Sequence, residues 1–263
     1  MSDALSRLFS IEGKAAIVTG GSRGIGRMIA TGFVEAGARV YISSRSAEAC
    51  DEVATELSKI GTCVAVPAHL GTMEGAEHLA STVADREPAL HILVNNAGAI
   101  WEEPLDEYSD AAFDKLWDIN VRAVFRLTKL LLPQLRAAAT PADPARIVNV
   151  GSIDALRPPL FETYAYSASK AGEHMLSQHL ALRLATDHIT VNVIAPGPFD
   201  SRMTRSTLGT EEGRRELLSH VPLARAGTPD EAAGVAIFLA SPAAAFITGA
   251  IIPLDGGMAV KPG

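Results

Sequence analysis

A tyrosine and a lysine four residues apart are the side chains of this sequence best suited to moving a proton. Tyr166 and Lys170 lie in a stretch, 165–186, whose pattern predicts a helix, so both side chains share one helix face. A neighbouring ammonium favours the phenolate and lowers the pKa of the phenol. The pair can therefore serve as acid and base for an oxygen atom that gains or loses a proton.

Ser152 directly follows a predicted strand, 146–150, where its hydroxyl could hydrogen-bond the reacting oxygen. Tyr164 is a rival proton donor, but only Tyr166 has a lysine four residues later. Taken singly, Tyr166 could be a packed aromatic, Lys170 a solvated helix residue and Ser152 a helix cap. Their order after the predicted strands favours the catalytic interpretation.

The elements that must position these side chains alternate along the chain. Several short runs are continuously apolar, as in strands covered on both faces. Their alternation with helices predicts an α/β fold with a parallel, doubly wound sheet, whose strand ends gather along one ligand-binding edge. The predicted strands are 15–19, 39–43, 63–67, 92–95, 146–150, 190–194 and 250–253. The predicted helices are about 24–36, 46–60, 73–86, 109–137, 165–186 and 229–240.

The composition of the 263-residue chain suits one large domain. Apolar residues make up 48% and charged residues 20%, which allows a sizeable buried core. The net charge of −7 disfavours nucleic acid and anionic membrane surfaces as partners. Cys50 and Cys63 have no metal or redox spacing, and we expect no metal site. The first 13 residues lack the apolar core of a secretory signal, so we expect a cytoplasmic protein.

One charge-free stretch, 232–252, is long enough to span a bilayer. It contains a Ser241-Pro242 break, two glycines and many alanines. We interpret it as the end of a buried helix, a break and a buried strand, not as a membrane span.

A glycine-rich turn follows the first predicted strand and opens a helix. Its spacing is Gly20-x3-Gly24-x-Gly26. Glycines there permit a tight turn and a close approach of a pyrophosphate, and the helix N-terminus supplies unpaired N–H groups. A glycine-rich turn alone is a weak signal, but its place between strand and helix favours a dinucleotide site.

The end of the second predicted strand decides between NAD and NADP. An NAD site commonly places a carboxylate there, on the ribose 2′-hydroxyl. This chain instead has Ser44 and Arg45, and Arg23 lies in the neighbouring turn. Two guanidiniums and a hydroxyl would bind a 2′-phosphate, whereas the alternative is two solvated surface arginines. Their shared place at one sheet edge favours NADP(H).

Taken together, the motifs resemble the short-chain dehydrogenase/reductase family. They occur in the family's order over nearly the whole chain, 1–263. The resemblance implies a single Rossmann-type domain with a seven-stranded parallel sheet, and NADP(H)-dependent oxidoreductase activity on a carbonyl or secondary alcohol. It also implies a homotetramer, with helices 109–137 and 165–186 paired across one two-fold axis and 246–258 packed across another. The motifs are the glycine turn, Asn95-Asn96-Ala97-Gly98, Asn120, Ser152, Tyr166-x3-Lys170, Pro196-Gly197 and Asp255-Gly256-Gly257.

The same resemblance implies roles for single residues. Lys170 would hold the ribose hydroxyls, and Asn120 would hold a water that links Lys170 to solvent. His69 stands where the family usually has an aspartate facing adenine, and Ser201 where it often has a threonine on the carboxamide. The catalytic set is Asn120, Ser152, Tyr166 and Lys170. The expected cofactor contacts are Gly20, Ser22, Arg23, Gly24, Ile25, Gly26, Ser44, Arg45, His69, Leu70, Asn96, Ala97, Gly98, Tyr166, Lys170, Pro196, Gly197, Phe199 and Ser201.

Within the family, the sequence is most similar to β-ketoacyl reductases, in particular those of the rhamnolipid-biosynthesis type. The matching stretches are 18–26, 35–45, 144–152 and 191–205. This resemblance implies a 3-oxoacyl thioester substrate. Reductases that take an acyl carrier protein usually present basic residues after both long helices.

Those places read Arg136-Ala137-Ala138-Ala139 and Thr186-Asp187-His188 here, and an aspartate repels an acidic carrier. Another small ketone, sugar or cyclic alcohol therefore stays open as the substrate. The alternative of another class is a catalytically idle NADP-binding regulator, against which the intact Ser152, Tyr166 and Lys170 set argues.

The segment 199–221 interrupts the alternation and predicts a lid over cofactor and substrate. Its Arg202-Met203-Thr204-Arg205 run suits an acyl group on a phosphate-bearing carrier such as coenzyme A. Gly209 and Gly213 could serve as hinges. The alternative is a helical insertion packed permanently on the body.

Overall fold

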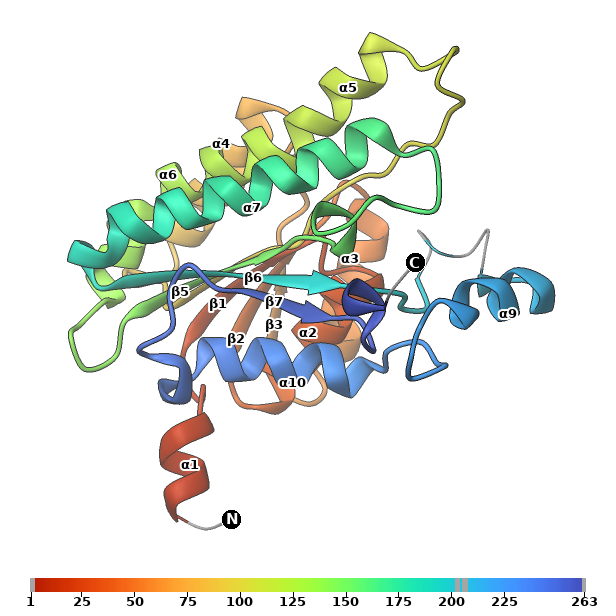
Figure 1. Ribbon diagram of the computed structural model, residues 1–263. Coiled ribbons are helices and arrows are strands. Elements are labelled where there is room, and N and C mark those ends of the chain that lie inside the picture. The colour runs from red at the N-terminus through yellow and green to blue at the C-terminus, as the bar shows by residue number, and fades with distance from the viewer. Residues whose placement is uncertain (1–2, 202–203, 205–207, 262–263) are drawn as a thin grey trace.

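Seven short strands form one parallel sheet through the middle of the molecule (Figure 1). The computed structural model describes residues 3–201, 204 and 208–261. The strand order is β3-β2-β1-β4-β5-β6-β7, and every residue of β1, β4, β5 and β6 is buried, as the apolar runs predict. The predicted doubly wound α/β fold is therefore confirmed. The strands are β1 Ala15–Thr19, β2 Arg39–Ser43, β3 Thr62–Ala65, β4 Ile92–Asn95, β5 Ala145–Val150, β6 Ile189–Pro196 and β7 Ile251–Leu254.

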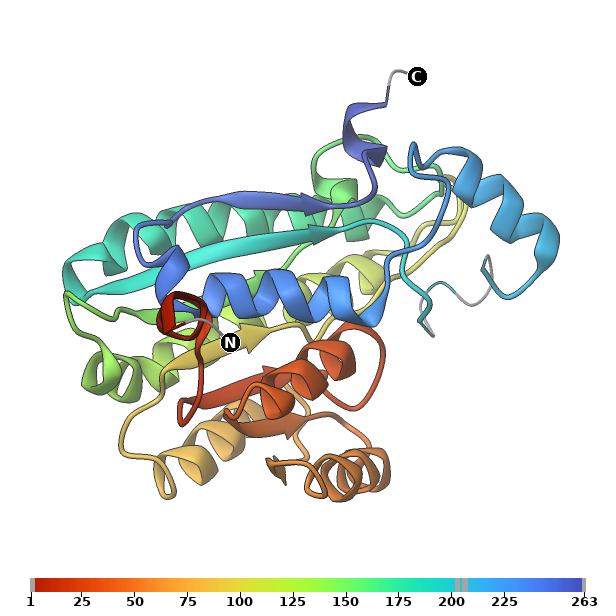
Figure 2. The ribbon, with the colours of Figure 1, turned by 90° about the horizontal axis from the view of Figure 1, so that it is seen from below.

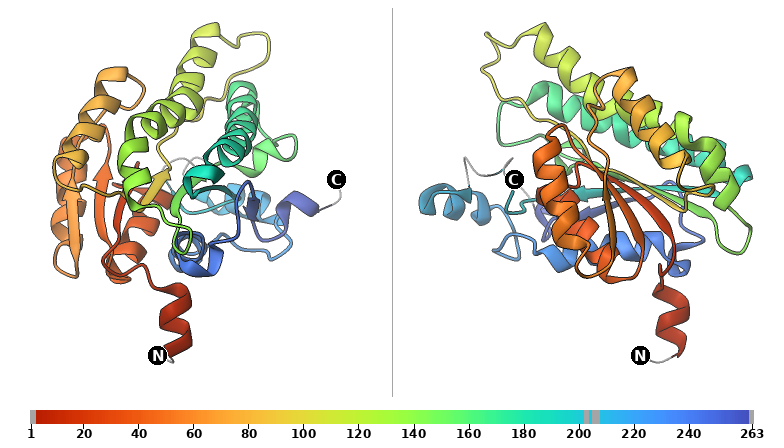
Figure 3. Two further views of the ribbon diagram at one scale, coloured as in Figure 1. Left: turned by 90° about the vertical axis from the view of Figure 1, so that its left-hand side faces the viewer. Right: turned by 180° about the vertical axis from the view of Figure 1, so that it is seen from behind.

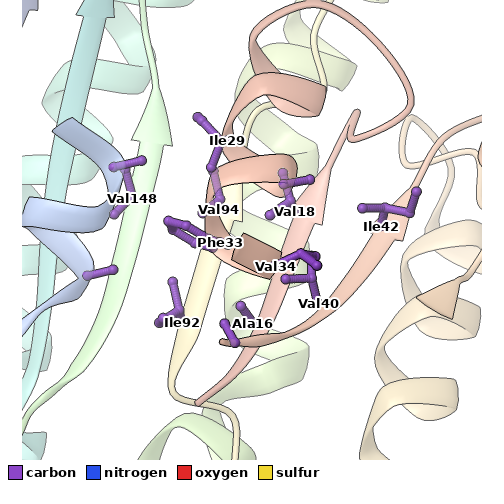
Figure 4. Packing of buried hydrophobic residues seen from close by; sticks show 14 of the residues in the cluster. Ala16, Val18, Ile29, Phe33, Val34, Val40, Ile42, Ile92, Val94 and Val148 are labelled. Atoms are coloured by element: carbon purple, nitrogen blue, oxygen red, sulfur yellow. The ribbon is translucent and has the colours of Figure 1, made fainter. Parts of the chain in front are cut away.

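Helices cover both faces of this sheet (Figure 3). One apolar cluster joins the sheet to α2, α3 and α10, and a second joins its other face to α4, α6 and α7. In the first cluster, Ile29 and Phe33 of α2 point onto the central strands (Figure 4). The long helices are α2 Gly24–Glu35, α3 Ala47–Leu57, α4 Met73–Ala84, α5 Asp110–Trp117, α6 Ala123–Ala138, α7 Tyr164–Leu184, α9 Glu211–Ser219 and α10 Pro229–Ala240. An N-terminal helix, α1 Asp3–Phe9, was not predicted and protrudes from this body (Figure 1).

The predicted helix at 109–137 is confirmed over 110–138, but a π-helical turn at Asp118–Arg122, which was not predicted, divides it into α5 and α6. Asn120 lies in that turn and is fully buried. Its side chain bonds the Ala99 backbone and the Ser169 hydroxyl, which draws this part of the helix inward. Single π-helical turns of this kind are frequent at functional sites.

The charge-free stretch at 232–252 folds as a helix end, a break and a strand, as predicted. The helix α10 ends at Ala240, a 3-10 turn spans Pro242–Ala244, and β7 begins at Ile251. β7 lies at the sheet edge and is only half-buried, so the prediction of a buried strand was wrong there. No helix of the described residues is long and apolar enough to cross a membrane.

The strand order places a crevice between β1 and β4. The chain runs outward from β1 through β2 to β3 and then returns to pair β4 with the other edge of β1. Loops that leave the carboxyl ends of β1 and β4 therefore diverge, and ligands of open parallel sheets bind at such a point.

Candidate active site

A cavity of about 530 Å³ opens at the carboxyl ends of the strands. It brings together all the predicted cofactor and catalytic residues except Gly26 and Asn120, which lie behind its wall. The predicted residues that line it are Gly20, Ser22, Arg23, Gly24, Ile25, Ser44, Arg45, His69, Leu70, Asn96, Ala97, Gly98, Ser152, Tyr166, Lys170, Pro196, Gly197, Phe199 and Ser201.

The glycine turn after β1 has no room for a side chain at Gly20 or Gly26. Gly20 has a φ of +68°, and a Cβ there would lie 2.6 Å from Asn96 Nδ2. A Cβ on Gly26 would lie 2.4 Å from the Gly20 carbonyl oxygen. Asn96 Nδ2 donates to the Thr19 carbonyl at 2.9 Å, which locks the end of β4 against this turn. At Gly20 and Gly24, the backbone itself therefore forms the cavity surface.

Thr19 is a positioning residue that the sequence analysis did not assign. Its hydroxyl accepts hydrogen bonds from the backbone N–H groups of Asn96 and Ala97, both at 2.9 Å, and donates to the Val94 carbonyl at 3.3 Å. A hydroxyl residue directly before the first glycine was the available signal. Thr19 thus couples the β1 and β4 loops on either side of the crevice.

The N-terminus of α2 differs from those of most other long helices. Its N-cap residue, Arg23, makes no side-chain capping bond. Five other helices receive such a bond, from Ser46, Thr72, Ser109, Thr210 and Thr228. The first N–H groups of α2 therefore stay available to an anion at the cavity wall, where the helix dipole also favours negative charge.

Two arginines flank that helix start. Arg23 and Arg45 are exposed at the cavity rim, and within the described part of the chain neither pairs with a carboxylate. Ser44 already donates its hydroxyl proton to the Ser46 carbonyl at 2.9 Å. The predicted anion clamp therefore rests on the two guanidiniums rather than on Ser44.

Ser152 and Tyr166 face each other at the inner end of the cavity. Both are buried, and the Ser152 hydroxyl lies close enough to Tyr166 to lower its pKa. The Ser152 Oγ also accepts the Asp154 backbone N–H at 3.1 Å, which fixes its orientation. Tyr164 instead donates to Glu162 at 2.8 Å, so of these two tyrosines only Tyr166 lines the cavity.

The expected lowering of the Tyr166 pKa by Lys170 is wrong. Burial raises the pKa of Tyr166 above its ordinary value, and the charges of Asp154 and Glu173 raise it further. The Lys170 ammonium donates to the Val150 carbonyl at 2.7 Å and to Glu173 Oε2 at 2.6 Å. The carboxylate of Glu173 neutralises the charge that was expected to stabilise the phenolate.

Asn120 serves as a structural clamp in this geometry. Its Nδ2 donates to the Ala99 carbonyl at 3.0 Å and to Ser169 Oγ at 2.9 Å, while Oδ1 accepts the Ala99 N–H at 3.0 Å. Both amide N–H groups are therefore used within the protein. The side chain fixes the loop after β4 to α7, and a water contact would fall to other atoms of Asn120.

The chain after β6 returns to the glycine turn. A Cβ on Gly24 would lie 3.3 Å from the Ser201 Cβ, and Thr204 Oγ1 donates to the Phe199 carbonyl at 2.6 Å. Phe199 is buried against Gly227. Of the predicted lid, Arg202, Met203 and Arg205 lie outside the described residues.

An apolar wall and one carboxylate complete the cavity beyond Ser152. Leu160, Phe161, Leu217 and Met258 line the wall. Asp154 also lines it, and burial raises the pKa of its carboxyl to about 6 against the opposing charge of Arg157. Asp154 was not among the predicted site residues, although it stands only two residues after Ser152. No group of three or more metal-ligating side chains lies together in the described parts of the chain.

A parallel sheet with an anion-binding turn after β1 and a buried serine, tyrosine and lysine at one cavity defines a dinucleotide-dependent oxidoreductase. A family model described as enoyl-(acyl carrier protein) reductase matches residues 20–259. The chain belongs to the short-chain dehydrogenase/reductase family.

Three known proteins show how close this likeness is. The rhamnolipids biosynthesis 3-oxoacyl-[acyl-carrier-protein] reductase of Pseudomonas aeruginosa is 47% identical over 249 residues, 95% of this chain and 97% of its own. The 3-oxoacyl-[acyl-carrier-protein] reductase FabG of Vibrio harveyi is 35% identical over 95% of this chain and 98% of its own. The solved Pseudomonas aeruginosa RhlG/NADP active-site complex matches with a TM-score of 0.94 and 46% identity, covering 96% of this chain and 99% of that one.

Proposed function

We propose that this protein uses NADPH to reduce a 3-oxoacyl thioester to the 3-hydroxyacyl thioester. The observation that carries the proposal is the cavity, which joins the glycine turn to the Ser152–Tyr166 pair and continues along an apolar wall. A nucleotide and an extended acyl chain fit the two ends of such a site. The 3-oxoacyl reductases among the similar proteins support the choice of substrate.

The residues present suit NADP(H). The uncapped start of α2 and the side-chain-free turn at Gly20 would receive the pyrophosphate. Arg23 and Arg45 would bind the 2′-phosphate, which NADH lacks. The solved complex of a similar protein contains NADP, which supports this choice.

The protein groups supply orientation and the proton. When bound, NADPH supplies the hydride to the carbonyl carbon. Ser152 holds the carbonyl oxygen, and Tyr166 donates its phenolic proton to that oxygen as negative charge develops. The raised pKa of Tyr166 keeps the phenol protonated, which suits an acid in the direction of reduction. The Lys170 ammonium lines the same cavity and would hold the ribose hydroxyls of the nucleotide.

The carrier of the acyl group is proposed to be coenzyme A rather than an acyl carrier protein. Arg136 donates to Asp187 at 3.0 and 2.8 Å, so the two charges at the ends of α6 and α7 satisfy each other. That surface therefore has no free basic residue at these two positions for an acidic partner.

The segment 199–221 is proposed to act as the lid of a single domain that spans 1–263. Its helix α9 lies beyond the carboxyl ends of the strands, outside the two helical layers (Figure 2). Leu217 of α9 nevertheless lines the cavity. A small movement of α9 would thus change access to the substrate end.

We further propose a homotetramer that works in the cytoplasm. Large apolar side chains stay exposed along α5, α6 and α7, where a second copy would cover them, and at both ends of β7. They are Phe113, Trp117, Phe125, Met175 and Leu182 on the helices, and Phe246 and Val260 around β7. The two free cysteines fit a reducing compartment. A monomer in light scattering at micromolar concentration would contradict the assembly.

A panel of ketones tests the proposed reaction. NADPH oxidation should be fastest with 3-oxoacyl-coenzyme A, slower with the same acyl group on a carrier protein, and slow with sugars and cyclic ketones. Tyr166→Phe should lower kcat by about 2–4 orders of magnitude. A preference for a sugar or cyclic ketone would replace the substrate proposal, and tight NADPH binding without turnover of any ketone would favour an idle regulator.

A further inference from the structure

The catalytic lysine shares its ammonium with a second buried group that the proposed mechanism does not use. Glu173 lies one helical turn after Lys170 on α7 and is fully buried. Its Oε2 accepts from Lys170 Nζ at 2.6 Å, whereas Oε1 has no hydrogen-bond partner among the described residues. A buried carboxylate with one unpaired oxygen is costly to keep, so its place beside Lys170 needs an explanation.

The donors of Lys170 can be counted. An ammonium has three N–H groups, and the Val150 carbonyl and Glu173 take two of them. One N–H remains for the cavity. Lys170 itself lines the cavity, and a Cβ on the neighbouring Gly98 would lie 3.8 Å from Nζ, so the ammonium borders the cavity beside this glycine.

Among the residues that the structure describes, Glu173 is the only anion paired with Lys170. On α7 itself, burial and Lys170 lower the pKa of His174 to about 4, so this histidine is neutral near pH 7. Asp154, on the turn after Ser152, and Glu173 both act on Tyr166. The hydrogen-bond partner of Lys170 on β5 is the backbone carbonyl of Val150, which carries no charge.

We propose that Glu173 is a positioning residue for proton transfer at Tyr166: it holds the Lys170 ammonium in place and offsets its positive charge. The phenol then stays protonated until the substrate oxygen takes its proton, which biases the site toward reduction. This inference rests on the proposed function. Burial raises the pKa of Glu173 itself to about 7, so the carboxylate is charged at the higher pH where Tyr166 ionises.

The variant Glu173→Gln tests whether the negative charge of Glu173, and not only its size, acts on Tyr166. The amide has nearly the same shape and keeps an oxygen that can accept from Lys170. It removes the negative charge, so Lys170 acts on Tyr166 uncompensated and the pKa of Tyr166 should fall by about one unit. A residue that only filled space would leave that pKa unchanged.

The first readout needs no substrate. The near-ultraviolet absorbance of phenolate is titrated in the full chain and in Tyr166→Phe, and the difference reports Tyr166 alone. The same difference in the Glu173→Gln background should show ionisation at lower pH. Glu162→Gln is the matched control, because this exposed carboxylate bonds Tyr164 instead and should leave the Tyr166 titration unmoved.

The second readout is the pH profile for oxidation of a 3-hydroxyacyl-coenzyme A, in which Tyr166 acts as the base. Its lower limb should shift to lower pH in Glu173→Gln, and Glu173→Asp should stay near the unsubstituted protein. If the Gln variant does not fold, Glu173→Leu removes the same charge and makes the same test.

The outcomes separate the two proposals. An unshifted or raised Tyr166 titration in Glu173→Gln would overturn the role of Glu173, whatever the substrate. A lowered titration without turnover of any thioester would keep that role and overturn the proposed substrate.

Discussion

Strands β1 and β6 end at the same edge of the sheet. The loops that follow these two strands form the walls of the site in different ways. After β1, the turn depends on bare backbone, because a Cβ at Gly20 or Gly26 would collide with Asn96 Nδ2. After β6, the surface includes the side chains of Phe199, Ser201 and Thr204. A backbone site admits few residue types, whereas many side chains can line an apolar wall. This difference explains why the residues that bind the cofactor can be predicted from the sequence, whereas those that select the substrate cannot.

The largest expected effect on activity comes from Tyr166, which lies between the cofactor end and the substrate end of the cavity. Tyr166→Phe removes the proton donor and should lower kcat by about 2–4 orders of magnitude, while NADPH affinity stays nearly unchanged. Tyr164→Phe is the control, because that hydroxyl bonds Glu162 outside the cavity and its loss should be mild. Equal losses of kcat in the two variants would show that the proton comes from elsewhere.

The second effect tests the backbone surface after β1. Gly26→Ala places a methyl group 2.4 Å from the Gly20 carbonyl oxygen, so the turn must shift. NADPH affinity should therefore fall at least about tenfold. Gly234→Ala on α10 is the control, because a Cβ there meets nothing within 4 Å. Fluorescence titration with NADPH measures both. An unchanged affinity in Gly26→Ala would mean that the turn is not the pyrophosphate site.

The third effect concerns the choice between nucleotides. Arg45→Asp removes one guanidinium and adds a carboxylate, so NADPH affinity should fall about 10- to 100-fold through the loss of charge-assisted hydrogen bonds. NADH lacks the 2′-phosphate and should lose little. Steady-state kinetics with both nucleotides give the ratio, and an NADH preference in the unsubstituted protein would refute the clamp.

These predictions differ in how much of their basis the sequence alone supplied. The apolar runs, the glycine spacing and the Tyr166–Lys170 interval each follow from a local rule, and the structure brings these residues around one cavity. The π-helical turn at Asp118–Arg122 could not be predicted from a local rule. It depends on hydrogen bonds from Asn120 to Ala99 and to α7, which are distant in the chain. The raised pKa of Tyr166 was also out of reach, since it depends on how deeply α7 buries both Tyr166 and Glu173.

The fourth effect tests the carboxylate at the substrate end. The folded-state pKa of Asp154, about 6, lies above its ordinary value of 3.8, so the folded protein binds this proton more tightly than the unfolded chain does. The stability that this proton contributes is present below pH 3.8 and is lost as the pH rises through about 6. Asp154→Asn should therefore raise Tm by a few degrees at pH 8 and hardly at all at pH 4. A gain that is equal at both pH values would show that the carboxyl is not strained by burial.

The smallest effect concerns mobility, and it compares two neighbouring helices of similar length. Helix α9 buries only Leu217, whereas α10 buries five residues, including Ala236 and Leu239, and begins with a capping box between Thr228 and Glu231. Few buried contacts imply a low free energy of local opening, so the amides of 211–219 should exchange quickly without ligand. If α9 closes over the cavity, NADPH together with a 3-oxoacyl-coenzyme A should slow their exchange severalfold, while the amides of 229–240 exchange slowly throughout. Strong protection of 211–219 before any ligand is added, unchanged afterwards, would contradict the lid and leave substrate choice to the fixed wall around Leu160 and Phe161.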